Sequence, residues 1–351
     1  MRSVIVNLFI IIAFFGLASC QESLTTNEPE PPVKTDISEF IGHWSFDIDG
    51  GFVGWLGVTR EDGYLDAELL WKWGSVTPVS NVFLANGNTL YVTRTGNLMR
   101  SPASEGDAPR IHVATSWMEA KTDGENISGY FLEPRADGTG VDSTWFEGIK
   151  LPDVPPAPDL TALNFGEPLN LFNGTDLSGW KLTNESQVNG FKVVDGVLFN
   201  DVARKPGEPR VNYGNLQTVE EFGDFNLKLE VNLPAGSNSG VYLRGMYEIQ
   251  VVDSYGRELD SHNMGGLYSR VAPSVNAEKP AGQWQSMDIT LVDRHVTVLL
   301  NDVKILDNVP VYGPTGGALT SDVFAPGPIY LQGDHGVVSY RNIVLTPIIN
   351  Q

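Results

Sequence analysis

Residues 225–233 read FNLKLEVNL, and this stretch indicates the fold class. Its apolar residues occupy every second position, which is the pattern of a β-strand with one buried face and one wet face. The same alternation returns in residues 285–291 and 296–300, which are separated by an Asp293-Arg294 turn. These runs predict antiparallel sheets that each bury one face against the other.

The composition of the chain agrees with an all-β protein. Its 351 residues include 37 Gly and 22 Pro with 10% aromatic residues, and no long amphipathic stretch is visible, which favours short strands joined by turns. The length predicts two domains. The net charge of −20 opposes binding to nucleic acid or to an anionic membrane surface, so we expect neither partner.

The N-terminus has the features of a bacterial lipoprotein signal peptide in residues 1–20. Arg2 precedes an apolar run over residues 4–17, and small residues lead to Cys20 in a sequence that resembles the lipobox. We expect Cys20 to be lipidated, with residues 21–36 as a polar, proline-rich tether. A non-lipidated signal peptide with an incidental cysteine is the alternative. The prediction is a protein of the bacterial cell envelope, in the periplasm or on the outer-membrane surface, that touches the membrane through its lipid anchor.

The rest of the chain predicts two folded units. Residues 37–150 contain short alternating runs between Asp-Gly and Asn-Gly turns, which predicts a small β-barrel or sandwich. Its tryptophans either stack on sugars or fill the core, and we assign this unit no chemistry. Residues 151–162 are a proline-rich linker, and residues 163–350 form the second domain. The tryptophans in question are Trp44, Trp55, Trp71, Trp73, Trp117 and Trp145.

Several blocks in residues 163–350 together resemble one bacterial family, the 3-keto-disaccharide hydrolases or 3-keto-glucoside 1,2-lyase/hydratases. The resemblance implies a concanavalin-like jelly-roll sandwich, preceded here by the smaller β domain. The unit before residue 151 lies outside the resemblance. The blocks are LFNGTDLSGW (171–180), NSGVYLR (238–244), YEIQVVDSYG (247–256), GGLY (265–268), NA (276–277), KPAGQW (279–284), LQGDHG (331–336) and YRNI (340–343).

The resemblance also implies a carbohydrate substrate that carries a ketone at carbon 3 of a sugar. The ketone makes the neighbouring C2 proton acidic, so a base removes it and the C1 oxygen leaves by elimination. Water then adds back, and the net reaction is hydrolysis. Such chemistry requires a base, a group that stabilises the enolate oxygen and an acid for the leaving group. A separate sugar 3-dehydrogenase would have to act upstream.

The predicted catalytic residues are Glu248, Arg244 and His335. The alternation places Tyr242, Arg244, Glu248 and Gln250 on one wet face if an odd-length loop joins the two strands. Glu248 is then the leading base and Arg244 stabilises negative charge. His335 is suited to acid–base work or metal binding. The alternatives are a surface ion pair between Arg244 and Glu248, and a structural role for His335.

Seven further residues are predicted to bind the substrate. Gln250 would orient hydroxyl groups, Asp253 extends the polar row or caps a strand end, and Tyr268 and Trp284 either stack on a sugar ring or seal the core. No cofactor is evident because no nucleotide loop and no metal motif is visible, but a divalent metal ion stays an open alternative. The seven residues are Tyr242, Gln250, Asp253, Tyr268, Asn276, Trp284 and Gln332.

Two other functions compete with the enzyme that cleaves 3-keto-glycosides. A non-catalytic, lectin-like envelope lipoprotein would use the same sandwich, since fold alone does not determine function. An ordinary glycosidase would require two carboxylates about 5–9.5 Å apart across one cleft, and the sequence nominates Glu248 and Asp253 for that pair.

Overall fold

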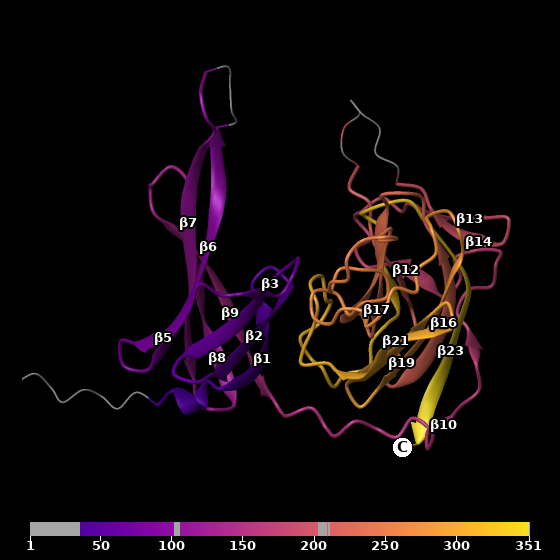
Figure 1. Ribbon diagram of the computed structural model, residues 1–351, viewed down its shortest axis with the longest axis horizontal. Coiled ribbons are helices and arrows are strands. Elements are labelled where there is room, and N and C mark those ends of the chain that lie inside the picture. The colour runs from indigo at the N-terminus through magenta and orange to yellow at the C-terminus, as the bar shows by residue number, and fades with distance from the viewer. Residues whose placement is uncertain (1–35, 102–105, 203–208, 210, 351) are drawn as a thin grey trace, which may run out of the picture. The chain divides into compact units, whose positions relative to one another are not determined.

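The computed structural model describes residues 36–101, 106–202, 209 and 211–350, and the described part is all-β apart from the short 3₁₀-helix η1 (Ile37–Glu39) (Figure 1). The signal peptide, Cys20 and all but the last residue of the predicted tether lie outside the described residues. Across the ranges described here, we find no helix with the length and apolar character needed to span a membrane.

The N-terminal sheet is a nine-stranded antiparallel meander in the order β4-β3-β2-β1-β9-β8-β7-β6-β5. It curls, since β3 and β5 contact each other without being hydrogen-bonded neighbours, and its concave side holds a core around Trp44, Phe46 and Phe146. Trp71 stacks on Phe131 inside this core, with ring centroids 4.3 Å apart. The strands are β1 (Gly42–Ile48), β2 (Phe52–Arg60), β3 (Leu65–Trp71), β4 (Thr77–Pro78), β5 (Asn81–Ala85), β6 (Thr89–Ser101), β7 (Arg110–Thr122), β8 (Asn126–Pro134) and β9 (Val141–Leu151).

The C-terminal part is a sandwich of two antiparallel sheets, as the sequence predicts. The larger sheet has the order β13-β14-β23-β16-β19-β20-β21, with β10 and β11 also paired to β23, and the smaller sheet has the order β12-β15-β22-β17-β18. The strands are β10 (Asn164–Phe165), β11 (Leu169–Asn170), β12 (Trp180–Leu182), β13 (Phe191–Val194), β14 (Val197–Asn200), β15 (Leu216–Thr218), β16 (Phe225–Asn232), β17 (Asn238–Leu243), β18 (Tyr247–Val252), β19 (Gln285–Val292), β20 (His295–Leu300), β21 (Val303–Pro310), β22 (Tyr330–Leu331) and β23 (Val338–Asn350).

The alternating stretch of the sequence forms β16, whose apolar side chains are buried while those between them are only partly covered. It pairs with β19 on one side and with β23 on the other, so it is a central strand. Asp293 and Arg294 close the β19–β20 hairpin with φ angles of 48° and 58°, the backbone that a tight primed turn requires. The local pattern therefore predicts both the strands and this turn.

Residues Thr35–Gln351 form one compact unit. Residues 152–163 contain no strand, and contacts join the N-terminal sheet to the sandwich. The Trp55 indole donates a hydrogen bond to the Tyr312 carbonyl at 2.8 Å, and Leu70 and Val76 belong to the same apolar cluster as the sandwich core. The domain boundaries predicted from the sequence stay a prediction, since packing continues across them.

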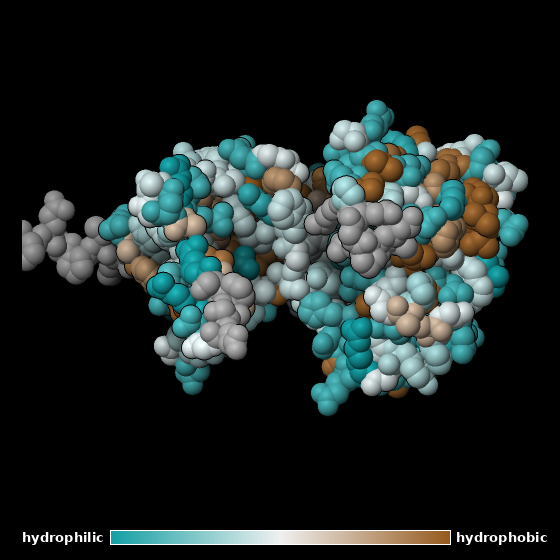
Figure 2. All heavy atoms as spheres, turned by 90° about the horizontal axis from the view of Figure 1, so that it is seen from above, coloured by the Kyte–Doolittle hydropathy of each residue, from teal (hydrophilic) through white to brown (hydrophobic). Residues whose placement is uncertain are grey.

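On the face shown in Figure 2, hydrophilic and intermediate residues dominate, and hydrophobic residues gather in small patches. Single exposed apolar residues are normal on protein surfaces, so these patches alone indicate no partner.

Candidate active site

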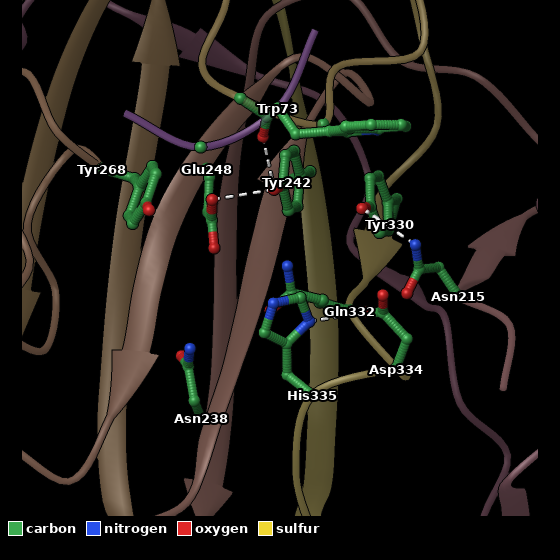
Figure 3. Close-up of a pocket in the computed structure, with 13 residues that line it drawn as sticks. Trp73, Asn215, Asn238, Tyr242, Glu248, Tyr268, Tyr330, Gln332, Asp334 and His335 are labelled. Atoms are coloured by element: carbon green, nitrogen blue, oxygen red, sulfur yellow. Dashed lines mark hydrogen bonds and ion pairs between the residues drawn. The ribbon is translucent and has the colours of Figure 1, made fainter. Parts of the chain in front are cut away.

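The β17–β18 hairpin provides the central side chains of the site. Residues 244–246 form an odd-length loop, and in this register Tyr242 pairs with Glu248 across the two strands. Neighbours opposite each other on antiparallel strands project to the same face. The hairpin therefore presents Tyr242 and Glu248 together, and both line one cavity of about 320 Å³ (Figure 3).

The walls of this cavity come from segments that are far apart in the sequence. Tyr268 precedes a turn and is held against β18, because its backbone N–H donates to the Glu248 carbonyl at 3.0 Å. Tyr330 lies on the neighbouring strand β22. The complete lining is Trp73, Gly74, Asn215, Asn238, Tyr242, Glu248, Tyr268, Gly316, Gly317, Tyr330, Gln332, Asp334 and His335.

Glu248 is a buried carboxyl, with only 3% of the residue exposed. Burial raises its pKa to about 8, and the negative charge of Asp334 acts in the same direction, whereas the hydrogen bond with Tyr242 opposes the shift. Loss of hydration disfavours a charged carboxylate, which is why the first effect dominates. Glu248 is therefore mostly protonated at neutral pH and ionises in the mildly basic range.

The Tyr242 hydroxyl connects Glu248 to the backbone. It lies 2.8 Å from Glu248 Oε2 and 2.7 Å from the carbonyl oxygen of Gly316. A phenol carries one proton, so it donates to only one of these two acceptors at a time. Both contacts are satisfied when a protonated Glu248 donates to Tyr242 and Tyr242 donates to Gly316. The geometry therefore agrees with the raised pKa of Glu248.

Gly240 makes room for the Glu248 carboxyl on the neighbouring strand. A Cβ atom at this position would lie 2.3 Å from Glu248 Oε1, well inside van der Waals contact. Its φ angle is not in the left-handed region, so the glycine is required here by space and not by backbone conformation.

Two tyrosine rings form one wall of the cavity. Tyr242 and Tyr330 stack with centroids 4.0 Å apart and an interplanar angle of 8°, and the Asn215 amide donates to the Tyr330 hydroxyl at 3.1 Å. Burial raises the pKa of both phenols above the usual value. They stay protonated at neutral pH and serve as hydrogen-bond donors and acceptors, not as charges.

Two amide oxygens in the lining lack a partner among the described residues. They are Asn238 Oδ1 and Gln332 Oε1, and both atoms are buried. A buried acceptor without a partner costs about 1–3 kcal/mol, and such groups call for an explanation. Hydroxyl groups of a bound sugar would satisfy both oxygens, which favours a polyhydroxylated ligand.

His335 and Asp334 occupy the more exposed edge of the cavity. His335 Nδ1 lies 2.7 Å from Asp334 Oδ1, and the two side chains are 45% and 37% exposed. Figure 3 shows this pair with Asn238 on the side of the cavity opposite Trp73. His335 therefore lies in the cavity beside a carboxylate, and its role in acid–base chemistry stays a prediction.

The structure brings together only some of the residues predicted from the sequence. Those that line the cavity are Tyr242, Glu248, Tyr268, Gln332 and His335.

Arg244 is the main correction. It lies in the hairpin loop with a φ of 54°, not on β17, so its side chain leaves the shared face. The guanidinium donates to the carbonyl oxygens of Val323 and Ala325 instead and does not line the cavity. The alternative of a surface ion pair with Glu248 is wrong as well, since both residues are buried and the Arg244 guanidinium holds the loop before β22.

Four predicted binding residues also lie outside the cavity. Gln250 is buried and its side-chain oxygen accepts from the Val251 N–H at 2.9 Å. Asp253 Oδ2 accepts from the Gly236 N–H at 2.8 Å, which is the strand-end role considered for it. Trp284 lies beneath a guanidinium, 4.0 Å from the ring centroid to Arg341 Cζ, and Asn276 is exposed elsewhere. The placements of Gln250, Asn276 and Trp284 correct the predicted contact with the substrate, whereas Asp253 takes the strand-end alternative.

The sequence did not identify five of the larger lining residues. Asn238 and Asp334 fall inside two of the blocks quoted for the resemblance, and that position was the one available signal. Asn215, Tyr330 and Trp73 fall outside every block, and only tertiary contacts bring them to Glu248.

No cluster of three or more His, Cys, Asp or Glu side chains suited to a metal ion occurs in the described ranges. The lining, over the same ranges, also holds no Lys or Arg. The hydrogen-bond donors of the lining are therefore the tyrosine hydroxyls, the amide groups and His335.

The chain is similar to several solved structures. A candidate glycosyl hydrolase from Parabacteroides distasonis ATCC 8503 is 29% identical over 56% of this chain and 92% of its own, with a TM-score of 0.42. A second candidate glycosyl hydrolase from this organism is 22% identical over 52% of this chain and 94% of its own, with a TM-score of 0.40. The carbohydrate binding module CBM66 from Bacillus subtilis is 12% identical over 47% of this chain and 93% of its own, with a TM-score of 0.31.

A search of curated proteins found no match. The family model for the 3-keto-alpha-glucoside-1,2-lyase-like domain matches residues 167–346, which is slightly more than half of the chain and most of the sandwich. The chain therefore belongs to the family of 3-keto-alpha-glucoside-1,2-lyase-like domains, and its C-terminal half is a carbohydrate-active domain of that family.

Proposed function

We propose that this protein cleaves 3-keto-glycosides, as 3-keto-disaccharides or 3-keto-glucosides, by elimination followed by hydration. The observation that carries the proposal is the Glu248 carboxyl, which is buried, has a pKa raised to about 8 and faces a polar cavity. A proton on carbon beside a ketone calls for a stronger base than an ordinary carboxylate, and burial supplies that strength.

The first step is removal of the C2 proton by ionised Glu248. The electron pair of the C2–H bond moves into the enolate of the C3 ketone, and its return expels the C1 oxygen and forms a C1–C2 double bond. The Tyr242 hydroxyl lies 2.8 Å from Glu248 Oε2, so it can pass the captured proton to the leaving oxygen. Base and acid are then two ends of one hydrogen-bonded pair.

Neutral donors stabilise the enolate oxygen in this proposal. Arg244, the residue predicted for that role, does not line the cavity, but the amides of Asn238 and Gln332 and the Tyr330 hydroxyl do. Fixed dipoles in a site with little water stabilise developing charge without a formal cation.

In the second step water adds to C1 and the proton returns to C2, which completes the net hydrolysis. We assign activation of this water to His335, which lies beside Asp334 at the open edge of the cavity. Water reaches that edge more easily than the buried side around Glu248, where the residue is 3% exposed.

A second function has one observation in its favour. Glu248 and Asp334 are two carboxylates in one cavity, and such a pair is what an ordinary glycosidase requires. Asp253, the partner expected from the sequence, lies outside the cavity, so Asp334 would replace it.

One experiment separates these functions. The purified protein is incubated with 4-nitrophenyl α-glucoside and with its 3-keto counterpart, each with and without EDTA, and nitrophenol release is measured against an enzyme-free blank. Cleavage of the keto substrate alone supports elimination. Cleavage of both substrates rejects it in favour of the two-carboxylate glycosidase, and binding without cleavage indicates a lectin. A loss of activity with EDTA would assign a role to a divalent ion.

A further inference from the structure

The N-terminal sheet contributes an aromatic side chain to the cavity of the sandwich. Trp73 follows β3 and is 64% exposed, whereas Trp44, Trp55 and Trp71 of the same sheet are buried. It lines the same cavity as Glu248 (Figure 3). An indole ring exposed to this degree at the mouth of a polar cavity has a face free for a ligand.

The segment that carries Trp73 is shaped for this position. Lys72 and Gly74 on either side have φ angles of 69° and 76°, so the backbone turns sharply at both neighbours of the tryptophan. The edge of the Phe52 ring packs against the indole with centroids 4.7 Å apart and an interplanar angle of 78°. Packing against Phe52 limits the rotation of the Trp73 side chain.

Contacts of the three residues that follow Trp73 fix this segment to the sandwich. A Cβ atom at Gly316 would lie 2.0 Å from the Gly74 carbonyl oxygen, so the two backbones touch only because residue 316 is glycine. The next two residues contact the sandwich as well. Ser75 Oγ lies 2.8 Å from His262 Nε2, and the Val76 N–H donates to Ser269 Oγ at 2.9 Å. These contacts hold residues 74–76 against the sandwich.

Gly316 also accepts the hydrogen bond of Tyr242 at 2.7 Å. Gly316 therefore contacts both the Tyr242 hydroxyl and Gly74, the residue that follows Trp73. The position of the indole is linked to the position of the catalytic pair through one backbone unit.

We propose that Trp73 stacks on the group attached to C1 of the reacting sugar and selects leaving groups that contain a ring. The inference rests on the proposed function. A cavity of about 320 Å³ is at the small end of ligand cavities, so one sugar ring beside Glu248 leaves little room for a second. The attached group then lies at the mouth, where Trp73 is exposed.

The chemistry of the indole fits a sugar or aryl ring. One face of a pyranose presents C–H groups that carry slight positive charge, and the π face of tryptophan carries negative charge, so the two attract and exclude water. A methyl group at C1 offers no such face. Trp73 therefore favours disaccharides and aryl glycosides over methyl glycosides.

The test compares a 3-keto-disaccharide with methyl 3-keto-α-glucoside as substrates for the full chain and for Trp73→Ala. We expect kcat/KM for the disaccharide to fall about ten-fold, equivalent to about 1.4 kcal/mol, with less than about a two-fold change for the methyl glycoside. Trp73→Phe should retain most of the preference. An equal loss on both substrates, or no loss on either, overturns the inference.

Trp145→Ala is the matched control. Trp145 lies on β9 of the same sheet, and its ring centroid is 4.9 Å from that of Tyr130. It does not line the cavity, so kcat/KM should be unchanged for both substrates. If the wild-type protein cleaves no glycoside, calorimetric binding of an unoxidised disaccharide and of methyl α-glucoside gives a separate answer. A disaccharide preference that Trp73→Ala removes supports the stacking role, and the absence of such a preference in wild type overturns it.

Discussion

Replacing Glu248 with glutamine tests the buried carboxyl directly. Glutamine has nearly the same size and keeps a hydrogen-bonding group near Tyr242, but it cannot ionise. In the folded protein burial raises the pKa of Glu248 to about 8, whereas the ordinary value, which applies to the unfolded chain, is 4.5. The two states of the wild-type protein therefore bind different numbers of protons between these pH values.

The sign and size of the effect follow from that difference. Between pH 4.5 and about 8 the folded state keeps a proton that the unfolded state has released, so the wild-type free energy of unfolding falls as pH rises. The slope is about 1.4 kcal/mol per pH unit, and the total is on the order of 5 kcal/mol. Glu248→Gln escapes this loss, so its stability relative to wild type rises over the same range and levels off above it.

Urea unfolding of both proteins at several pH values from 5 to 9 measures this trend. Glu221→Gln is the matched control for the substitution, since Glu221 is exposed, and a pH trend that both variants share does not come from the buried carboxyl. A stability difference for Glu248→Gln that is flat with pH, or that falls as pH rises, would refute the raised pKa. The same variant should lose about 10²–10⁴-fold in kcat, the usual contribution of a general base.

Four further predictions concern the same site. Tyr242→Phe should lower kcat and cost about 1–3 kcal/mol of stability, because the buried Gly316 carbonyl loses its donor and protonated Glu248 loses its acceptor. An unchanged urea midpoint and an unchanged kcat would contradict this. Gly240→Ala should displace the Glu248 carboxyl and lower activity, whereas Gly223→Ala, where an added Cβ meets nothing within 4 Å, should not. A stopped assay across pH should show kcat/KM rising toward about pH 8 as Glu248 ionises, and a profile that falls over this range would exclude it as the base. Trp284→Ala should leave KM unchanged in steady-state kinetics, since that side chain lies outside the cavity.

The sequence alone was sufficient for the sandwich and for the core of the hairpin. Alternation over residues 225–233 determines which side chains are buried, because every second residue of a strand faces the same way. The odd number of residues between β17 and β18 places Tyr242 and Glu248 on the same face for the same local reason, although which residues pair depends on where the loop begins. These features depend on neighbours in the chain, so a local pattern can carry them.

Arg244 and Gln250 show where local reasoning ends. Alternation placed both beside Glu248, but Arg244 falls in the loop, and whether a residue near a turn belongs to strand or loop depends on where the hairpin closes. Gln250 does lie on β18, yet residues 265–266 pair with its backbone and it is buried away from the cavity. Packing by a distant segment decided both outcomes.

The cavity itself is a product of tertiary structure. Three of its lining residues come from strand ends and turns far from Glu248 in the sequence, namely Asn215, Tyr330 and Trp73. The spacing of these residues in the sequence does not predict that they line one cavity. The raised pKa of Glu248 has the same origin, since burial is its largest cause. The sequence determined that a glutamate and a tyrosine share one face of two neighbouring strands, whereas the removal of water by the surrounding segments, which changes the proton affinity of the glutamate, was decided only by the folded structure.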